Sequence, residues 1–133
     1  MSNLQTVQAI YAAFGQGDVE GVLAKCVAAP EWEYGGTSTN VPWLQHQTDR
    51  AGAIANMVSG GTDLAIEKFD LKDLIEGNGV VVALLDIEFT VKRTGKRVTE
   101  VDAVQLWRFN DAGQVTQFRQ RVDTHQQQRA WDV

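Results

Sequence analysis

Three turn signals divide the second half of the chain into long segments, and they constrain the fold more than any other feature. Gly77-Asn78-Gly79, Thr94-Gly95 and Asp111-Ala112-Gly113 separate stretches in which polar and apolar residues alternate. Short Gly- and Asn-rich turns between alternating stretches are typical of antiparallel hairpins. The pattern therefore predicts a meander of long strands over residues 64–76, 80–92, 97–110 and 114–124.

The first half of the chain has the spacing of helices. Apolar residues recur at helical intervals over Leu4–Phe14, and Ser2 with Gln5 has the pattern of a capping box. Asp18 and Asp49 each precede a further apolar stripe and are suited to cap a second and a third helix. Helices followed by strands predict an α+β fold in which three helices pack on one face of a mostly antiparallel sheet.

Length and composition limit the classes of protein to consider. The 133 residues allow a single domain, residues 1–133, and a net charge of −5 argues against a nucleic-acid partner. We expect no membrane segment and a cytoplasmic protein, because no apolar run reaches spanning length and no targeting segment is recognised. Cys26 stands alone among apolar residues and fits a helical core thiol. His46 and His125 match no metal-ligand spacing, so neither a metal nor a cofactor is expected.

The register of the central hairpin decides which side chains share a face of the sheet. A two-residue turn at Thr94-Gly95 places Glu88 opposite Val101 and Asp86 opposite Ala103. One face then carries Val82, Leu84, Asp86 and Glu88 with Val101, Ala103, Gln105 and Trp107.

The other face of the same hairpin is apolar as well, although no helix is left in the sequence to cover it. A second copy of the chain could cover it, since a two-fold axis lets one patch complement itself. We therefore predict a homodimer through the convex face of the sheet, formed by Ala83, Leu85, Ile87, Val104 and Leu106.

Four segments of the chain together resemble one known family. They are VQAIYAAFGQGDVEGVLAKCV, EWEYG, VALLDIEFTV and VQLWRFNDAGQVTQFRQRVDT. In order and spacing they resemble the SnoaL-like branch of the nuclear transport factor 2-like superfamily, over almost the whole chain. The resemblance implies a curved sheet around a conical pocket that the N-terminal helices close. Members include ketosteroid isomerase, limonene epoxide hydrolase, polyketide cyclases and non-catalytic binding modules, so the fold alone does not decide the function.

The catalytic residues of ketosteroid isomerase are not conserved in this resemblance. Its general base falls at Tyr34 and its oxyanion-hole aspartate at Gln105. Its oxyanion tyrosine falls at Ile10, with Tyr11 one residue away. That chemistry therefore does not carry over whole.

The Asp–Arg–Asp arrangement of limonene epoxide hydrolase is retained only in part. Its Arg-x-Asp pair falls at Asp86 and Glu88, and its second aspartate falls at Gln120. SnoaL-type cyclases use a last-strand aspartate, and Asp123 is the nearest match. The Asp–Arg–Asp arrangement is therefore incomplete in this sequence.

Asp86 and Glu88 are the predicted catalytic residues. Two carboxylates on one buried strand face would repel each other, an environment typical of general acids and bases. The alternative is that the segment merely alternates, with both acids on a wet outer face and Ile87 inward. Periodicity favours the alternative and the resemblance favours the pocket.

The remaining candidates are aromatic and amide side chains that could line the pocket for a small apolar molecule. The other interpretation of the aromatic ones is an ordinary core position, and Trp43 lies in a loop where it could form a lid. We predict an acid/base isomerase, cyclase or hydrolase for a polyketide- or steroid-like ligand, or else a binding module in which amides replace lost carboxylates. The ligand-binding candidates are Tyr11, Trp32, Tyr34, Trp43, Leu84, Gln105, Trp107, Phe118 and Gln120.

Overall fold

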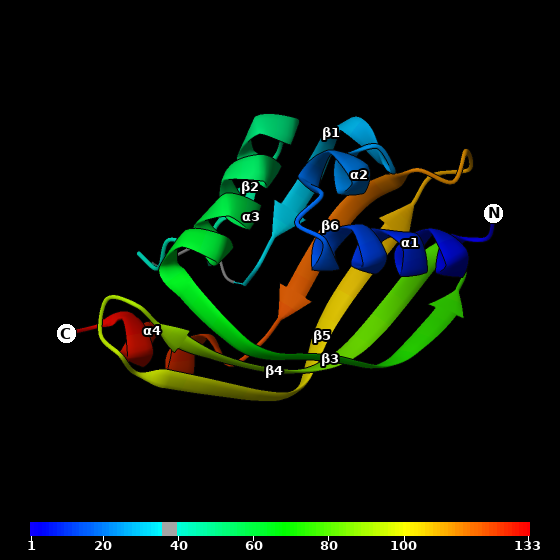
Figure 1. Ribbon diagram of the computed structural model, residues 1–133. Coiled ribbons are helices and arrows are strands. Elements are labelled where there is room, and N and C mark those ends of the chain that lie inside the picture. Colours follow the sequence, from blue (N-terminus) through cyan, green and yellow to red (C-terminus); the bar gives the residue numbers. More distant parts are fainter. Residues whose placement is uncertain (36–39) are drawn as a thin grey trace.

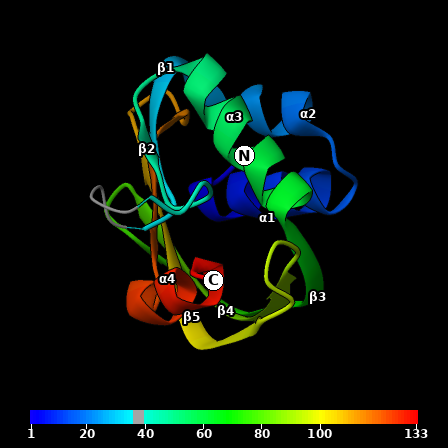
Figure 2. The ribbon, with the colours of Figure 1, turned by 90° about the vertical axis from the view of Figure 1, so that its left-hand side faces the viewer.

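A curved sheet of six strands bends around the helices (Figures 1 and 2). The structure is a computed structural model and describes residues 1–35 and 40–133. The strands are β1 (Cys26–Glu33), β2 (His46–Gln47), β3 (Leu64–Gly77), β4 (Val80–Val91), β5 (Arg97–Phe109) and β6 (Val115–Arg121). Their order is β2-β1-β6-β5-β4-β3. Neighbours are antiparallel except β1 and β6, which are parallel.

The helices lie on the inner side of the sheet, and their starts follow from the caps expected from the sequence. Ser2 and Gln5 form the capping box of the first helix, and the side chains of Asp18 and Asp49 accept hydrogen bonds from Gly21 N and Gly52 N at 2.9 and 2.7 Å. The predicted α+β class is confirmed. The helices are α1 (Asn3–Gly15), α2 (Val19–Leu23), α3 (Arg50–Asp63) and α4 (Thr124–Trp131).

Two details of the helices differ from expectation. The short α4 was not predicted, and it folds back onto β5 with Asp123 as its N-cap, whose side chain accepts from Gln126 N at 3.0 Å. The second helix ends at Leu23, so Cys26 begins β1 instead of lying on a helix, although its thiol is buried as expected. No helix within the described residues is long and apolar enough to cross a membrane.

The predicted register of the β4–β5 hairpin is wrong, for two reasons. The strands separate after the pair Thr90–Arg97, so the connection is longer than a two-residue turn. A β-bulge then inserts one residue of β5 between the pairs Ile87–Glu100 and Leu85–Ala103. Asp102 takes a positive φ of 56° in this bulge, a conformation that alternation does not reveal. One extra residue moves every later side chain of that strand to the other face.

Because of the bulge, Ala83 and Val81 of β4 lie opposite Gln105 and Trp107 of β5 and share the concave face with them. Alternate residues of β4 are buried on the concave face: Val81, Ala83, Leu85, Ile87, Phe89 and Val91. Three residues assigned above to the dimer face, Ala83, Leu85 and Ile87, are therefore core residues, and that assignment is corrected. On β5, Ala103, Gln105 and Trp107 do lie on the concave side as predicted, and Glu100 joins them there.

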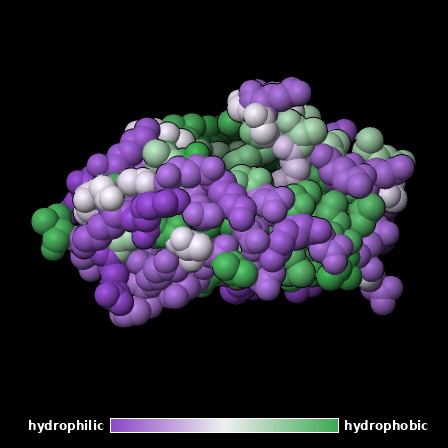
Figure 3. Space-filling model, turned by 60° about the horizontal axis from the view of Figure 1, so that its bottom comes forward, coloured by the Kyte–Doolittle hydropathy of each residue, from purple (hydrophilic) through white to green (hydrophobic). Residues whose placement is uncertain are grey.

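The convex face nevertheless carries an apolar band (Figure 3). Val104 and Leu106 belong to it as predicted, whereas Ile75, Val82 and Leu84 replace the three core residues. Figure 3 shows green apolar atoms toward the right of this face, between purple polar ones. Register places two rows of side chains across the strands: Ile75–Val82–Leu106–Arg119 and Asp73–Leu84–Val104–Arg121. We refer to Ile75, Val82, Leu84, Val104 and Leu106 as the convex band.

Candidate functional site

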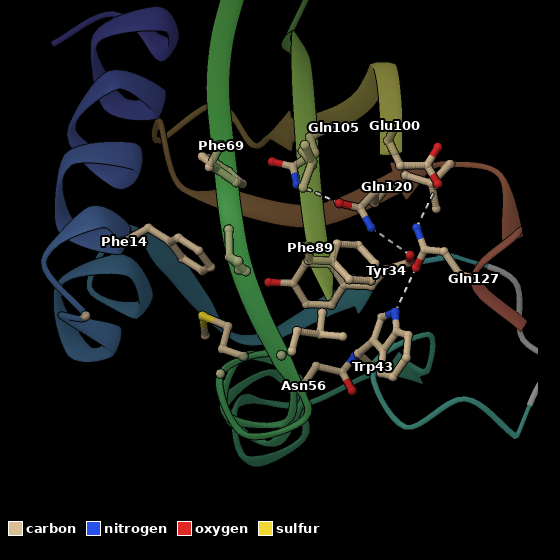
Figure 4. Close-up of a pocket in the computed structure, with 18 of the residues that line it drawn as sticks. Phe14, Tyr34, Trp43, Asn56, Phe69, Phe89, Glu100, Gln105, Gln120 and Gln127 are labelled. Carbon is tan, nitrogen blue, oxygen red and sulfur yellow. Dashed lines mark hydrogen bonds between the residues drawn. The ribbon is translucent and has the colours of Figure 1, made fainter. Parts of the chain in front are cut away.

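A cavity of about 260 Å³ lies between the concave face of the sheet and the helices (Figure 4). Gly60 and Gly61 at the end of α3 border it, as do the exposed Ile66 and Phe69 of β3. From the exposure of these residues we infer that the cavity opens on this side, which we call its mouth. A concave, largely apolar space with a few polar groups is typical of small-molecule sites. The apolar part of the lining consists of Phe14, Val19, Met57, Leu64, Ile66, Phe69, Ile87, Phe89 and Val122.

One chain of hydrogen bonds crosses the inner wall of the cavity. Trp107 Nε1 donates to the Tyr11 hydroxyl at 3.1 Å, and that hydroxyl donates to Gln105 Oε1 at 2.6 Å. Gln105 Nε2 donates to Gln120 Oε1 at 2.8 Å, and Gln120 Nε2 donates to the backbone oxygen of Tyr34 at 2.9 Å. Each amide is thereby held in one orientation, because its oxygen and nitrogen have different partners. The chain links α1, β5, β6 and the end of β1.

A second chain of hydrogen bonds ends on a carboxylate. Trp43 Nε1 donates to Gln127 Oε1 at 2.7 Å, and Gln127 Nε2 donates to Glu100 Oε2 at 2.9 Å. The backbone N–H of Asp123 donates to Glu100 Oε1 at 3.1 Å. Among the described residues that line the cavity, Glu100 carries the only carboxyl group, and none is Lys, Arg or His. Its exposed fraction is 6%.

The polar groups gather at one end of the cavity. Figure 4 shows Glu100, Gln105, Gln120 and Gln127 together, with Phe14 on the opposite side. The site is thus polarised, with hydrogen-bonding groups at the inner end and apolar groups toward the mouth.

Tyr34 lines the cavity and Tyr11 bonds to Gln105 in its wall, and burial raises the pKa of each tyrosine. The pKa of Tyr11 is raised above its ordinary value by burial, against the lowering effect of the bond from Trp107. Burial raises the pKa of Tyr34 to about 12.

We expect neither tyrosine to ionise near pH 10 while the protein is folded. The unfolded chain has ordinary phenol groups with a pKa of about 10, so it loses these protons first. The contribution of the two tyrosines to the free energy of unfolding should therefore be constant below about pH 10. It should fall as the pH rises from about 10 toward 12. Tyrosinate absorbance followed together with circular dichroism measures both effects. A phenolate signal at pH 10 with native circular dichroism would show that the phenols are not buried as described.

Four of the predicted ligand-binding residues line the cavity: Tyr34, Trp43, Gln105 and Gln120. Tyr11, Trp32, Trp107 and Phe118 instead surround a smaller void of about 20 Å³ beside it, which Tyr34 and Gln105 also border. Trp32 stacks on Phe118 with ring centroids 4.6 Å apart and meets Trp107 edge-on at 5.6 Å. These aromatic side chains form the support behind the cavity wall.

Leu84, Asp86 and Glu88 do not line the cavity, and their predicted position there is corrected. They lie on the convex side of β4, because the bulge in β5 breaks the alternation from which the pocket face was inferred. Asp86 pairs with Lys72 at 2.8 Å, which lowers the pKa of Asp86. Glu88 pairs with Arg97 at 2.9 Å. The interpretation as plain alternation, with Ile87 inward, describes this segment correctly.

Sequence reasoning missed Glu100, Gln127 and Asn56 as cavity residues. Alternation counted back from Trp107 puts Glu100 on the outer face, and only the bulge brings it inside. Gln127 belongs to α4, for which Asp123 followed by a short polar segment was the available signal. Asn56 is buried on α3 and donates to the backbone oxygen of Gln45 at 2.9 Å.

The comparison with protein families decides what kind of domain this is. Residues 7–118 match the model of the SnoaL-like domain. The chain belongs to this family. The resemblance inferred from the four sequence segments is thereby confirmed, and the SnoaL-like domain spans most of the chain.

Solved structures with this fold support the same conclusion. A nuclear transport factor 2-like protein of unknown function from Burkholderia pseudomallei is 25% identical, with a TM-score of 0.85 and 100% of both chains covered. TerC, co-crystallised with polyporic acid, is 25% identical with a TM-score of 0.80 and 96% of both chains covered. A candidate polyketide cyclase from Xanthomonas campestris pv. campestris shares the fold at 18% identity, with a TM-score of 0.72 and coverage of 97% and 98%. No curated protein matches the sequence.

The described residues contain no group of three or more His, Cys, Asp or Glu side chains that could hold a metal ion. The acid in the cavity, Glu100, has two neutral hydrogen-bond donors as partners. The Glu100 carboxyl group can transfer a proton, and the amides of the described lining can form hydrogen bonds.

Proposed function

We propose that this SnoaL-like domain binds a small, largely apolar molecule in the cavity and that Glu100 acts on it as a general base or acid. The observation that carries the proposal is the buried carboxylate of Glu100, the only charged side chain among the described residues that line the cavity. Isomerisation, cyclisation and hydrolysis can each use a proton transfer of this kind. The co-crystal of TerC with polyporic acid supports a small-molecule ligand for this chain as well.

The remaining polar groups would orient the ligand. Gln127 and the N–H of Asp123 each hold one oxygen of Glu100, so the carboxylate has a fixed position. Both oxygens retain acceptor capacity, because a carboxylate accepts about four hydrogen bonds. The Tyr34 side chain lines the same cavity and could meet a ligand oxygen with its hydroxyl.

A non-catalytic binding module is the second candidate. Gln105 and Gln120 are neutral amides at positions where the resemblance places carboxyl groups of catalytic relatives, and they are bonded to each other. If that loss ended catalysis, Glu100 would serve binding only. Turnover that is lost when Glu100 is replaced would favour the enzyme, and absence of turnover would favour the binding module.

A plug at the mouth tests whether the cavity is the binding site. We expect Gly61→Phe to weaken binding of the neutral apolar dye N-phenyl-1-naphthylamine at least about tenfold, since buried apolar contact drives such binding. A Cβ at Gly61 meets nothing within 4 Å, so the backbone there accepts a side chain. Fluorescence titration of the dye measures the affinity.

Gly77→Phe is the matched control, because its Cβ also meets nothing within 4 Å and Gly77 does not line the cavity. It should bind the dye as the unchanged protein does. Equal affinity of all three proteins would place the binding site elsewhere.

We also propose that two copies of the chain pair through the convex band. The two rows of side chains that cross the convex face end at Arg119 and Arg121 of β6. The row that ends at Arg121 begins at Asp73 of β3. A two-fold axis along the strands would bring Asp73 near Arg121 of the partner subunit and cover apolar side chains that contribute about 1–3 kcal/mol each when buried.

Leu106→Glu should therefore give a monomer in sedimentation velocity at micromolar concentration, since it places a charge in the middle of the buried patch. Val58→Glu changes an exposed apolar residue on α3 and should leave the dimer intact. A monomeric unchanged protein of 14.7 kDa would contradict this proposal.

A further inference from the structure

The charge of the cavity is unbalanced. Glu100 is buried, and none of the described side chains that line the cavity with it is a cation. Its hydrogen-bond partners, the Gln127 amide and the Asp123 N–H, are neutral. A buried carboxylate is costly unless a positive charge accompanies it. The described lining residues do not provide this positive charge, so a ligand can supply it.

Aromatic side chains line the cavity next to these polar groups. The hydrogen-bond chain from Glu100 through Gln127 leads directly to Trp43. Trp43 meets Phe89 edge-on, with ring centroids 6.0 Å apart and planes at 83°. Phe89 is two residues from Ile87, the partner of Glu100 across the sheet, and therefore lies on the same face at diagonal distance.

Tyr34 adds a third aromatic side chain to this lining (Figure 4). Trp43 and Phe89, set at right angles, thus line the same cavity as the Glu100 carboxylate, with Gln127 between Trp43 and Glu100. Aromatic faces attract cations, and cages of such rings recognise ammonium groups.

We infer that the ligand of this cavity carries a protonated amine, which pairs with Glu100 against the rings of Trp43 and Phe89, on an apolar body that extends toward the mouth. The inference rests on the proposed function, because it requires the cavity to be the binding site. An anionic ligand is disfavoured, because it would bring a second negative charge next to Glu100.

Three compounds with one apolar body test the inference. 4-Phenylbutylamine, 4-phenylbutan-1-ol and 4-phenylbutanoate differ only in the terminal group and are cationic, neutral and anionic at neutral pH. Isothermal titration calorimetry should show the amine binding at least about tenfold more tightly than the alcohol, and the carboxylate binding most weakly.

Two variants locate the preference in the protein. Glu100→Gln should weaken amine binding about 30-fold or more, as expected for removal of one member of a buried charge pair, and leave alcohol binding within about threefold. Phe89→Leu keeps an apolar side chain and should weaken amine binding about fivefold with little change for the alcohol. Glu88→Gln lies on the convex side and should change neither. Native circular dichroism of each variant verifies that it is folded.

The outcomes separate this inference from the proposed function. Binding of the alcohol or the carboxylate as tightly as the amine overturns the amine inference and leaves the cavity as a small-molecule site. An amine preference that persists in both Glu100→Gln and Phe89→Leu also overturns it. Failure of all three compounds to bind the unchanged protein, together with unchanged dye binding in Gly61→Phe, overturns the proposed function as well.

Discussion

Replacement of Glu100 by Gln is expected to lower kcat by about 100- to 10,000-fold, the usual contribution of a general acid or base. The substitution keeps the size of the side chain, and an amide oxygen can still accept from Gln127 or from the Asp123 N–H. It removes the only carboxyl group among the described residues that line the cavity. One of the two donors then faces the new NH2 group, so urea unfolding of the variant has to accompany the rate measurement, and the loss of kcat is assigned to proton transfer in the folded protein.

The measurement is the initial rate at saturating substrate, for a substrate found by screening isomerisation, cyclisation and hydrolysis reactions with the unchanged protein. Asp86→Asn and Glu88→Gln are the controls, because both acids pair with cations on the convex side. They should keep kcat within about twofold. Full turnover in Glu100→Gln would remove Glu100 from the chemistry, and absence of any turnover in the unchanged protein would favour the binding module.

Replacement of Trp32 by Ala is expected to lower the free energy of unfolding by about 3–5 kcal/mol, the cost of truncating a large buried aromatic side chain. Trp32 is 1% exposed. Its ring stacks on Phe118 and meets Tyr34 and Trp107 edge-on. It thus joins β1 to β6 and β5 behind the cavity, and neighbouring rings cannot fill the space that its loss leaves.

Urea unfolding followed by circular dichroism measures this loss. Trp131→Ala is the matched control, because Trp131 is only partly buried and packs at the edge of the core against Trp43 and Arg93. Its loss should be clearly smaller. Equal losses in the two variants would mean that the ring cluster around Trp32 is not a principal part of the core.

Much of the fold could be predicted from local signals in the sequence. The caps Ser2, Asp18 and Asp49 start helices where expected, because capping depends on side chains within one turn of the backbone they bind. The turn signals end strands within a few residues of the observed positions, for the same reason. α4 was missed because it has few apolar residues and is held by contacts distant in sequence, such as that of Thr99 with Gln126.

The candidate site was predictable only where no bulge intervenes. Gln105 and Gln120 face each other across β5 and β6 in regular register, and both line the cavity as expected. The catalytic acid was wrongly assigned to Asp86 and Glu88 because of the bulge at Asp102. Its extra residue reverses which residues of β5 point inward on the two sides of the bulge. Alternation assigns the residues of a strand to its two faces relative to one chosen residue. A bulge adds one residue without changing the polar and apolar pattern on either side of it, so alternation cannot detect it.

A crystallographic screen of small neutral and cationic fragments tests the central claim most directly, because it locates binding without assuming a substrate. We predict fragments in the cavity between α1, α3 and β4, with amine-bearing ones contacting Glu100 and their apolar parts directed toward Gly61 and Phe69. Fragments that gather on the convex side, with the cavity left unbound by any compound at saturating concentration, would contradict the claim that this cavity is the functional site.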